Sequence, residues 1–228
     1  MPLLLPTEQV DTPHLLKTSS RQAASLLPHK DYERAQLLLF AGKKDQGKTT
    51  ALKSYIEICE PRVFILDPFD DFATVRQRLD LADALRDMAE GGPGRRRVVP
   101  PLVVEDENGE IVKAGSREYA HRFFKLAIAS LRNCLVVLDE MSLWSGNRED
   151  AILQAVILQG RRLGLRLAVA CQRIQLIPGV MLSEATEMVL FKMRRPRDLE
   201  VVKEWAGEDV AAQLPKLKQG ECIILNDL

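Results

Sequence analysis

An apolar run that leads directly into a glycine loop constrains the fold of this chain more than any other feature of its sequence. The run LLLFA, residues 37–41, ends at Gly42, and four residues separate Gly42 from the triplet Gly47-Lys48-Thr49. A continuous apolar run is typical of a strand buried on both faces of a parallel sheet. Residues 48–59 then have the pattern of a helix. The sequence therefore predicts a strand, a phosphate-binding loop and a helix in succession.

The chemistry of such a loop follows from its position at the start of a helix. Backbone N–H groups of the loop can surround a β-phosphate, the Lys48 ammonium can reach the β- and γ-phosphates, and the Thr49 hydroxyl can ligate Mg²⁺. The alternative is a structural turn rich in glycine. The residues that we expect to contact a nucleotide are Gly42, Lys43, Lys44, Asp45, Gln46, Gly47, Lys48, Thr49 and Thr50.

The rest of the chain alternates between apolar strands and helices, which predicts an α/β fold with a mostly parallel sheet covered on both faces. We expect an N-terminal arm over residues 1–35 and one nucleotide-binding domain over residues 36–228. Residues 95–112 predict a hairpin insertion, because Asn108-Gly109 stands between two apolar arms. The expected strands span residues 36–42, 61–67, 133–139, 165–172, 187–193 and 221–226, and the expected helices span 48–59, 72–90, 116–131, 148–163 and 197–206.

A second motif, CLVVLDE, places two acids at the end of a buried strand. Asp139 would lie at the carboxyl edge of the sheet, where a Mg²⁺ ion bound to phosphates needs an anion. Glu140 follows directly and can polarise an attacking water. Many strands end in Asp for reasons of turn geometry alone. Joined to the glycine loop, the pair favours hydrolysis of ATP, and the chain has no NKxD-like motif for reading guanine.

The next predicted strand ends in Gln172, whose amide could contact the γ-phosphate and report its presence to the loop of residues 173–179. The alternative is a glutamine that only caps the end of the strand. Its position relative to Asp139 favours the sensor.

These motifs, with the run GRRLGLRLAVACQRIQLIPG and the segment after it, resemble the FtsK-HerA superfamily of DNA-pumping ATPases. The matching features are an arginine-glycine helix end, a strand closing in Gln172, a loop containing Pro178, and a helix that starts at Pro196. The stretch LDPFDDF is similar to the end of the second strand in that superfamily, which puts Asp67 near the nucleotide. Within the superfamily, the chain most resembles the compact genome-packaging ATPases of tailless viruses that contain an internal membrane.

The resemblance implies a RecA-like P-loop NTPase that forms a ring, usually a hexamer, with ATP at the subunit boundaries. A neighbouring subunit would supply an arginine that stabilises charge on the transferred phosphoryl group. Arg161 and Arg162 match the position of that arginine, and Arg173 follows the sensor; the sequence does not separate the three. Capsid-vertex or membrane-associated proteins are the expected further partners, in the host cytoplasm or at a virion vertex.

Contact with double-stranded DNA has less support in the sequence. The 32 Lys and Arg residues balance the 32 Asp and Glu residues, so any attraction must come from local patches. The candidates are the clusters 95–97 and 194–197, which would bind phosphates without regard to base sequence. A solvated run of charges explains each cluster equally well.

The functional hypothesis is an ATPase that packages or translocates double-stranded DNA, with viral genome packaging as its specific form. Three alternatives stay open: a morphogenesis or secretion ATPase, a small-substrate P-loop kinase, and a nucleotide-binding scaffold without turnover. No apolar stretch of the chain is long enough to span a membrane as a helix.

Overall fold

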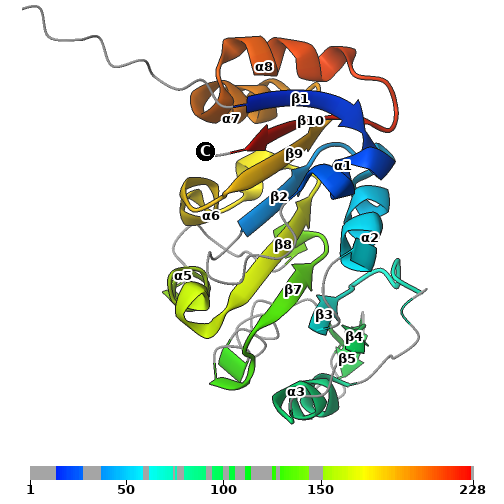
Figure 1. Ribbon diagram of the computed structural model, residues 1–228, viewed down its shortest axis with the longest axis vertical. Helices are drawn as coiled ribbons and strands as arrows, with labels where there is room; N and C mark the ends of the chain where they lie inside the picture. Colours follow the sequence, from blue (N-terminus) through cyan, green and yellow to red (C-terminus); the bar gives the residue numbers. More distant parts are fainter. Residues whose placement is uncertain are drawn as a thin grey trace, which may run out of the picture.

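The computed structural model shows an eight-stranded sheet with helices on both faces and a separate two-stranded hairpin (Figure 1). The structure describes residues 14–27, 37–58, 62–73, 75, 80–90, 94–99, 103–105, 111–113, 125–126, 129–143 and 151–226.

The large sheet has the strand order β1-β10-β9-β2-β8-β7-β3-β4. Strands β9, β2, β8, β7, β3 and β4 run parallel, whereas β10 is antiparallel to both β9 and β1. The RecA-like α/β fold with a mostly parallel sheet is therefore confirmed. The strands are β1 (His14–Ser19), β2 (Leu37–Ala41), β3 (Arg62–Leu66), β4 (Gly94–Val98), β7 (Cys134–Leu138), β8 (Leu165–Cys171), β9 (Glu187–Phe191) and β10 (Glu221–Asn226).

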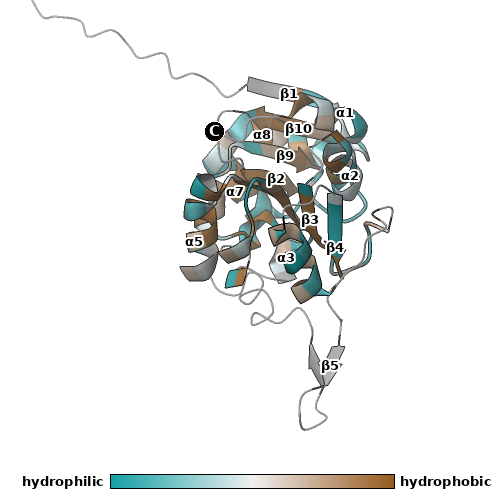
Figure 2. Ribbon diagram, turned by 60° about the horizontal axis from the view of Figure 1, so that its bottom comes forward, coloured by the Kyte–Doolittle hydropathy of each residue, from teal (hydrophilic) through white to brown (hydrophobic). Residues whose placement is uncertain are grey.

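The central strands are apolar throughout because both of their faces are covered. Alternate residues of β2 enter different cores: Leu37 and Leu39 belong to one apolar cluster, and Leu38 and Phe40 to the other. The first cluster includes residues of α3, α5, α6, α7 and α8, and the second includes residues of α1 and α2. Figure 2 shows the apolar strands enclosed between these helices. The helices are α1 (Ser20–Leu26), α2 (Lys48–Ile58), α3 (Leu81–Ala89), α5 (Ala151–Gly160), α6 (Gly179–Ser183), α7 (Pro196–Ala206) and α8 (Glu208–Gln213).

The helix predicted over residues 72–90 is shorter in the structure and begins at Leu81. Asp80 stands directly before the helix, and its carboxylate accepts a hydrogen bond of 2.8 Å from the backbone N–H of Asp83. This is the arrangement of a helix N-cap, which the apolar spacing of the region concealed. Most of the helix predicted over residues 116–131 lies outside the described residues, and residues 125–126 and 129–130 are helical.

The hairpin predicted over residues 95–112 is confirmed only in its second part. Strands β5 (Val103–Glu105) and β6 (Ile111–Lys113) pair antiparallel, on either side of the Asn108-Gly109 turn signal. The first part of the predicted hairpin is wrong, because Gly94–Val98 forms β4 and pairs parallel with β3 at the edge of the large sheet. Two arginines of this strand, Arg96 and Arg97, are therefore buried in the protein.

Part of the predicted N-terminal arm belongs to the large sheet. His14–Ser19 forms β1, which pairs along its whole length with β10, and Ser20–Leu26 forms α1. The remainder of the arm lies outside the described residues, and the boundary at residue 35 stays a prediction. In the part of the chain that the structure describes, no helix is long and apolar enough to cross a membrane.

Candidate active site

A polar cavity of about 820 Å³ opens at the carboxyl ends of β2, β7 and β8. The first and second motifs of the sequence meet here, as expected for parallel strands whose carboxyl ends share one edge of the sheet. The cavity is lined by Ser20, Arg21, Lys44, Asp45, Gly47, Lys48, Thr49, Thr50, Lys53, Phe69, Asp71, Asp139, Glu140, Gln172, Gln219 and Gly220.

The glycine loop leaves β2 with its backbone tied to both neighbouring strands. The N–H of Gly42 donates to the carbonyl of Cys171 at 3.2 Å, and the N–H of Lys43 donates to the carbonyl of Lys192 at 3.1 Å. A Cβ atom on Gly42 would lie 2.6 Å from the Cβ of Phe191, so only glycine fits between these strand ends. Asp45 has a φ of 61°, which curls the loop back toward the start of α2.

Lys48 lies in the first turn of α2 with its side chain folded over the loop. Its residue is 8% exposed, and its Nζ donates to the carbonyl of Lys43 at 2.9 Å. Burial lowers the pKa of the Lys48 ammonium, and the nearby carboxylates of Glu140 and Asp139 partly offset that effect. The positive charge is therefore held in a partly desolvated position, where an anionic ligand would interact with it strongly.

Asp139 and Thr49 are the residues that could hold Mg²⁺. Asp139 is 5% exposed, and its pKa is raised to about 7 by burial and then by the neighbouring carboxylates of Asp67, Asp71 and Glu140. This excess of negative charge fits a divalent cation, and the carboxylate and hydroxyl oxygens are ligands that Mg²⁺ prefers. No cluster of three or more His, Cys, Asp or Glu suited to a metal occurs among the described residues. The geometry suits an ion shared with phosphates, which needs only one or two protein ligands.

Glu140 is held in an uncommon backbone conformation with a φ of 52°. For a residue other than glycine this region is sparsely populated and costs free energy, so the surroundings must impose it. Two donors fix the carboxylate: the Ser142 hydroxyl and, at 3.4 Å, the backbone N–H of Gln172 both donate to its Oε1. The carboxylate thus lies at the cavity in a defined orientation, as a general base requires.

Gln172 reaches the cavity from β8, which lies between β2 and β7 in the sheet. The loop that follows is tied to α7 by an ion pair, in which Nε of Arg173 lies 3.0 Å from Oδ2 of Asp198. The side chain of Asp198 is 3% exposed and also accepts from the N–H of Gln175 at 3.4 Å. Arg173 is therefore engaged within its own chain.

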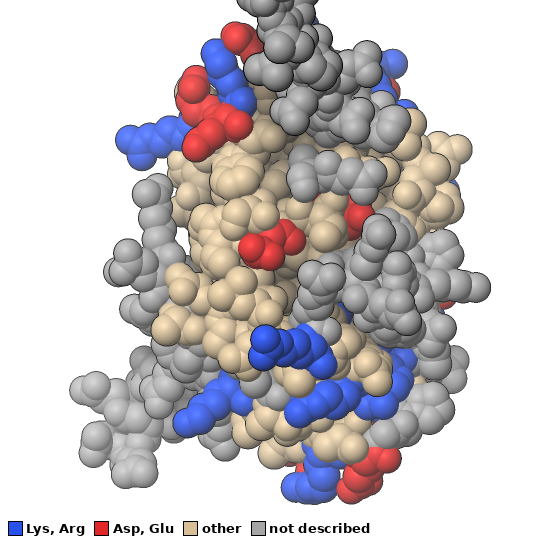
Figure 3. Space-filling view, turned by 60° about the vertical axis from the view of Figure 1, so that its left-hand side comes forward, with Lys and Arg blue, Asp and Glu red and all other residues tan. Residues whose placement is uncertain are grey.

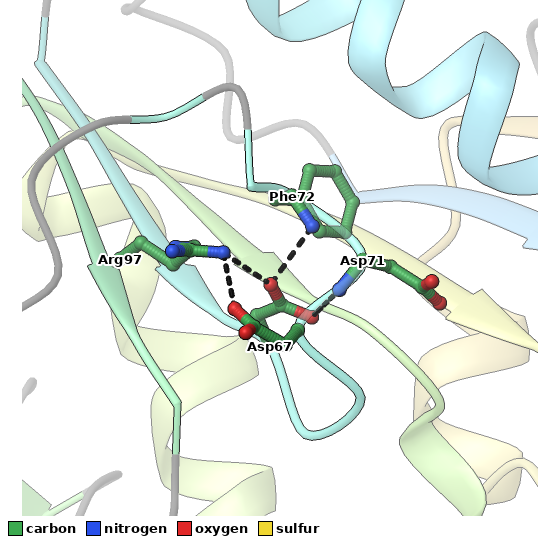
Figure 4. Close-up of polar contacts among 5 residues, drawn as sticks. Asp67, Asp71, Phe72 and Arg97 are labelled. Atoms are coloured by element: carbon green, nitrogen blue, oxygen red, sulfur yellow. Dashed lines mark hydrogen bonds and ion pairs between the residues drawn. The ribbon is translucent and has the colours of Figure 1, made fainter.

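Asp67 is fully buried beneath the cavity and does not line it. Its two oxygens accept hydrogen bonds of 2.9 Å from the N–H groups of Asp71 and Phe72, as Figure 4 shows. Nη1 of Arg97 lies 3.5 Å from Asp67 and also bonds Asp70. Asp67 thus shapes the loop that brings Phe69 and Asp71 to the cavity. Direct contact of Asp67 with a nucleotide stays a prediction, and Asp67 is not among the residues that line the cavity.

Two of the arginines considered for DNA contact are structural. Arg96 and Arg97 lie in β4 and are 3% and 6% exposed. Nε of Arg96 is paired with Asp87 of α3 at 2.6 Å, and Arg97 is paired with the Asp67 loop. The cluster 95–97 is therefore a strand with two of its three arginines buried, and the interpretation of it as an exposed arginine loop is wrong.

Arg162 lies at the opposite edge of the sheet from the cavity. It belongs to a 3₁₀ turn, Arg161–Leu163, that precedes β8, and β8 spans about 20 Å at the usual rise per residue. Arg162 is exposed and is not among the residues that line the cavity. It cannot reach the nucleotide site of its own chain. The side chain of Arg161 lies outside the described part of the structure.

The sequence motifs do not indicate several residues that line the cavity. Ser20 and Arg21 come from the supposed arm, and Gln219 and Gly220 come from the turn before β10. None belongs to a motif with a recognisable spacing, and only the pairing of β1 with β10 brings them to the loop. Phe69 and Asp71 follow Asp67 within the stretch LDPFDDF, so that stretch indicated the loop that reaches the cavity.

No protein-family model matches the chain. One curated relative, "Probable helicase MJECL08" of Methanocaldococcus jannaschii, is 24% identical over 146 residues, covering 56% of this chain. The chain spans only 28% of the length of that relative.

Several solved structures share the fold. The genome packaging NTPase B204 of Sulfolobus turreted icosahedral virus 2, in complex with AMPPCP, has a TM-score of 0.67 and 14% identity, over 85% of this chain and 93% of that one. The pCW3 conjugation coupling protein TcpA, with ATPγS, has a TM-score of 0.55 and 13% identity, over 86% and 58% of the two chains. VirB4 of Thermoanaerobacter pseudethanolicus has a TM-score of 0.54 and 13% identity, over 86% and 90%.

Fold and site together define the class of protein as a RecA-like P-loop NTPase. More particularly, the chain shares its fold with a genome packaging NTPase and with a conjugation coupling protein.

Proposed function

We propose that this protein is an ATPase that moves double-stranded DNA, and that its particular task is to package a viral genome into a procapsid. The observation that carries the proposal is the convergence of Lys48, Thr49, Asp139, Glu140 and Gln172 on one cavity. These side chains supply a phosphate-binding cation, two metal-ligand candidates, a base and an amide sensor. The shared fold with a genome packaging NTPase supports the choice of DNA as the moved substrate.

Each side chain has a role that its position allows. Lys48 and the loop N–H groups bind the β- and γ-phosphates, and Thr49 and Asp139 hold the Mg²⁺ that would neutralise charge on those phosphates. Glu140 orients water and accepts its proton. Gln172 contacts the γ-phosphate and, through the pair of Arg173 with Asp198, links its presence to α7.

The site needs one more cation, which we assign to a neighbouring subunit of a ring, with six subunits as the expected number. Arg162 is exposed at the edge of the sheet opposite its own cavity, so it can serve only the site of another copy. Arg132 is also exposed. It lies near Arg162, because the next residue of each segment is joined by a hydrogen bond of 3.0 Å from the backbone N–H of Asn133 to the carbonyl of Leu163. On the face shown in Figure 3, Lys and Arg side chains gather toward the lower end.

The remaining DNA-binding candidate is the cluster 194–197. Arg194, Arg195 and Arg197 are all exposed where β9 leads into α7. Arginines on a loop can bind phosphates without reading bases, and such binding weakens as salt rises. A ring would repeat the cluster in every subunit, so a chain with no net charge can still hold DNA.

A morphogenesis or secretion ATPase is the second candidate, because a conjugation coupling protein shares the fold. The two functions differ in whether duplex DNA stimulates hydrolysis. A small-substrate kinase would instead yield a phosphorylated acceptor, and a scaffold would show no turnover.

The decisive experiment measures phosphate release from ATP with and without duplex DNA, at low salt and over a range of protein concentrations. The wild type should hydrolyse ATP faster with DNA. Glu140→Gln should bind ATP with unchanged affinity and lose hydrolysis by two or more powers of ten, because only the base is removed. Arg194→Ala/Arg195→Ala/Arg197→Ala should keep basal hydrolysis and lose the stimulation. An absence of stimulation under all these conditions would refute the DNA motor and favour the second candidate.

A further inference from the structure

Ser20 and Arg21, at the start of α1, line the nucleotide cavity, and the segment that carries them is bonded to the glycine loop through the turn before β10. The backbone N–H of Ser20 donates to the carbonyl of Gly220 at 2.7 Å. The N–H of Gly220 in turn donates to the carbonyl of Gln46 at 3.2 Å. Only two backbone hydrogen bonds therefore separate the start of α1 from the loop that binds phosphate.

Close packing reinforces this connection. Gly47 has a φ of 105°, and a Cβ atom placed on it would lie 3.0 Å from both Cβ and Oγ of Ser20. Ser20 itself is 7% exposed. The glycine of the loop is thus needed for its backbone conformation and also for the approach of α1.

An apolar face anchors α1 against α2, the helix that follows the loop. Ala23, Ala24 and Leu27 are at most 1% exposed and share a core cluster with Leu52 and Tyr55 of α2. This burial fixes the direction of α1 and leaves Arg21, on its exposed side, at the cavity.

The strand order gives the cavity two distinct ends. Asp139, Glu140 and Gln172 come from β7 and β8 on one side of β2, whereas β10 and β1 lie on the other side, beyond β9. Under the proposed function the acids and the amide lie beside the γ-phosphate. The wall formed by Ser20, Arg21 and Gly220 then faces the α-phosphate side of the nucleotide, away from the reacting γ-phosphate.

We propose that Arg21 binds the α-phosphate of the nucleotide from within the same chain, so that nucleotide binding stabilises the docked N-terminal segment. The guanidinium matches the geometry of a phosphate, and Lys48 is already used by the β- and γ-phosphates. Arg21 is a binding residue and takes no part in the chemical step. This inference rests on the proposed nucleotide site and adds a residue to it.

The test compares ATP, inorganic tripolyphosphate and pyrophosphate as competitors of a fluorescent ATP analogue, on the full-length protein. Arg21→Ala should weaken ATP and tripolyphosphate about tenfold, as expected for the loss of a hydrogen bond to a charged group, and leave pyrophosphate within twofold. Arg21→Lys should be intermediate. Equal losses for all three competitors would place Arg21 at the reacting end, and a loss for ATP alone would place it on the nucleoside; either result would overturn the inference.

A matched control comes from the same segment. Lys17 is an exposed cation of β1 that pairs with Glu221 at 3.3 Å and does not line the cavity. Lys17→Ala should therefore bind all three competitors as the wild type does. A similar loss in both variants would indicate a general effect of surface charge and contradict the role of Arg21.

Hydrogen exchange provides a second readout. ATP should slow amide exchange in residues 14–27 of the wild type, and should slow it less in Arg21→Ala at equal site occupancy.

The variant Lys48→Ala separates the inference on Arg21 from the proposed nucleotide site. If Lys48→Ala loses ATP binding while Arg21→Ala binds ATP like the wild type, only the inference on Arg21 fails. If Lys48→Ala binds ATP normally, the nucleotide site itself is misplaced and both proposals fail.

Discussion

The ammonium nitrogen of Lys48 donates a hydrogen bond of 2.9 Å to the carbonyl oxygen of Lys43 in the same glycine loop. The two lysines therefore have different roles, although both belong to the motif. The side chain of Lys48 is buried and turned inward, whereas that of Lys43 is exposed.

This difference predicts unequal effects of substitution. Lys48→Met should weaken ATP binding at least a hundredfold, because it removes a partly desolvated cation from the phosphate site. Lys43→Met should change the affinity less than threefold, since the loop uses only its backbone. Isothermal titration with ATP and Mg²⁺ measures both values. Equal losses in the two variants would contradict the assignment.

The hydroxyl of Ser142 orients the carboxylate of Glu140. Ser142→Ala should lower kcat for phosphate release about three- to tenfold and leave the Kd for ATP unchanged, because the base loses a donor that positions it. Ser142→Thr keeps the hydroxyl and should retain most of the activity. Steady-state kinetics distinguish this result from a structural defect, which would also raise the Kd.

The raised pKa of Asp139 predicts how the stability of the protein depends on pH in the absence of Mg²⁺ and nucleotide. The raised pKa keeps a proton on Asp139 in the folded state up to about pH 7, whereas the ordinary pKa of an Asp side chain is 3.8. The folded state therefore binds more protons between these values. The free energy of unfolding should fall as pH rises from about 4 to about 7, by at most about 1.4 kcal/mol per pH unit from this group.

Asp139→Asn should remove that contribution and flatten the profile. Chemical unfolding in EDTA at several pH values from 5 to 8 measures the difference between the two proteins. A profile for the variant that parallels the wild type would show that another group titrates in this range.

Arg97 is buried and pairs with the buried Asp67 and with the half-exposed Asp70, which predicts a structural role for this arginine. Arg97→Met should lower the free energy of unfolding by about 3 kcal/mol, because it leaves the buried carboxylate of Asp67 without its cation. Arg95→Met in the same strand should cost less than about 1 kcal/mol, since the bond that Arg95 makes to the described residues is to the backbone carbonyl of Glu57. Urea denaturation gives both values, and a DNA-binding loss in Arg97→Met without loss of stability would restore the discarded interpretation.

Much of the fold was predictable because its signals are local. The apolar runs at residues 37–41, 134–138 and 165–171 are strands in the structure, and Asp139, Glu140 and Gln172 end them as expected. The carboxyl ends of parallel strands meet at one edge, so finding the strands was enough to bring these side chains to the glycine loop.

Other features depend on contacts that no local pattern reports. The run GRRRV, residues 94–98, has the composition of an exposed loop, yet it forms β4 because Asp87 and Asp67 pair with two of its arginines, which are themselves buried. The expectation that Asp67 lies near the nucleotide comes from the motif alone, and the sequence does not reveal that its two carboxylate oxygens accept hydrogen bonds from the N–H groups of Asp71 and Phe72.

The sequence by itself determined the parallel α/β fold and the phosphate-binding chemistry of the loop from Gly42 to Thr49, because both depend on residues that are close together in the chain. The tertiary structure decided which charges are buried and which strand closes the sheet. It also decided that Ser20 and Arg21 reach the cavity, since β1 pairs with β10 at the far end of the chain. That pairing joins residues about two hundred positions apart, and only the folded chain brings them together.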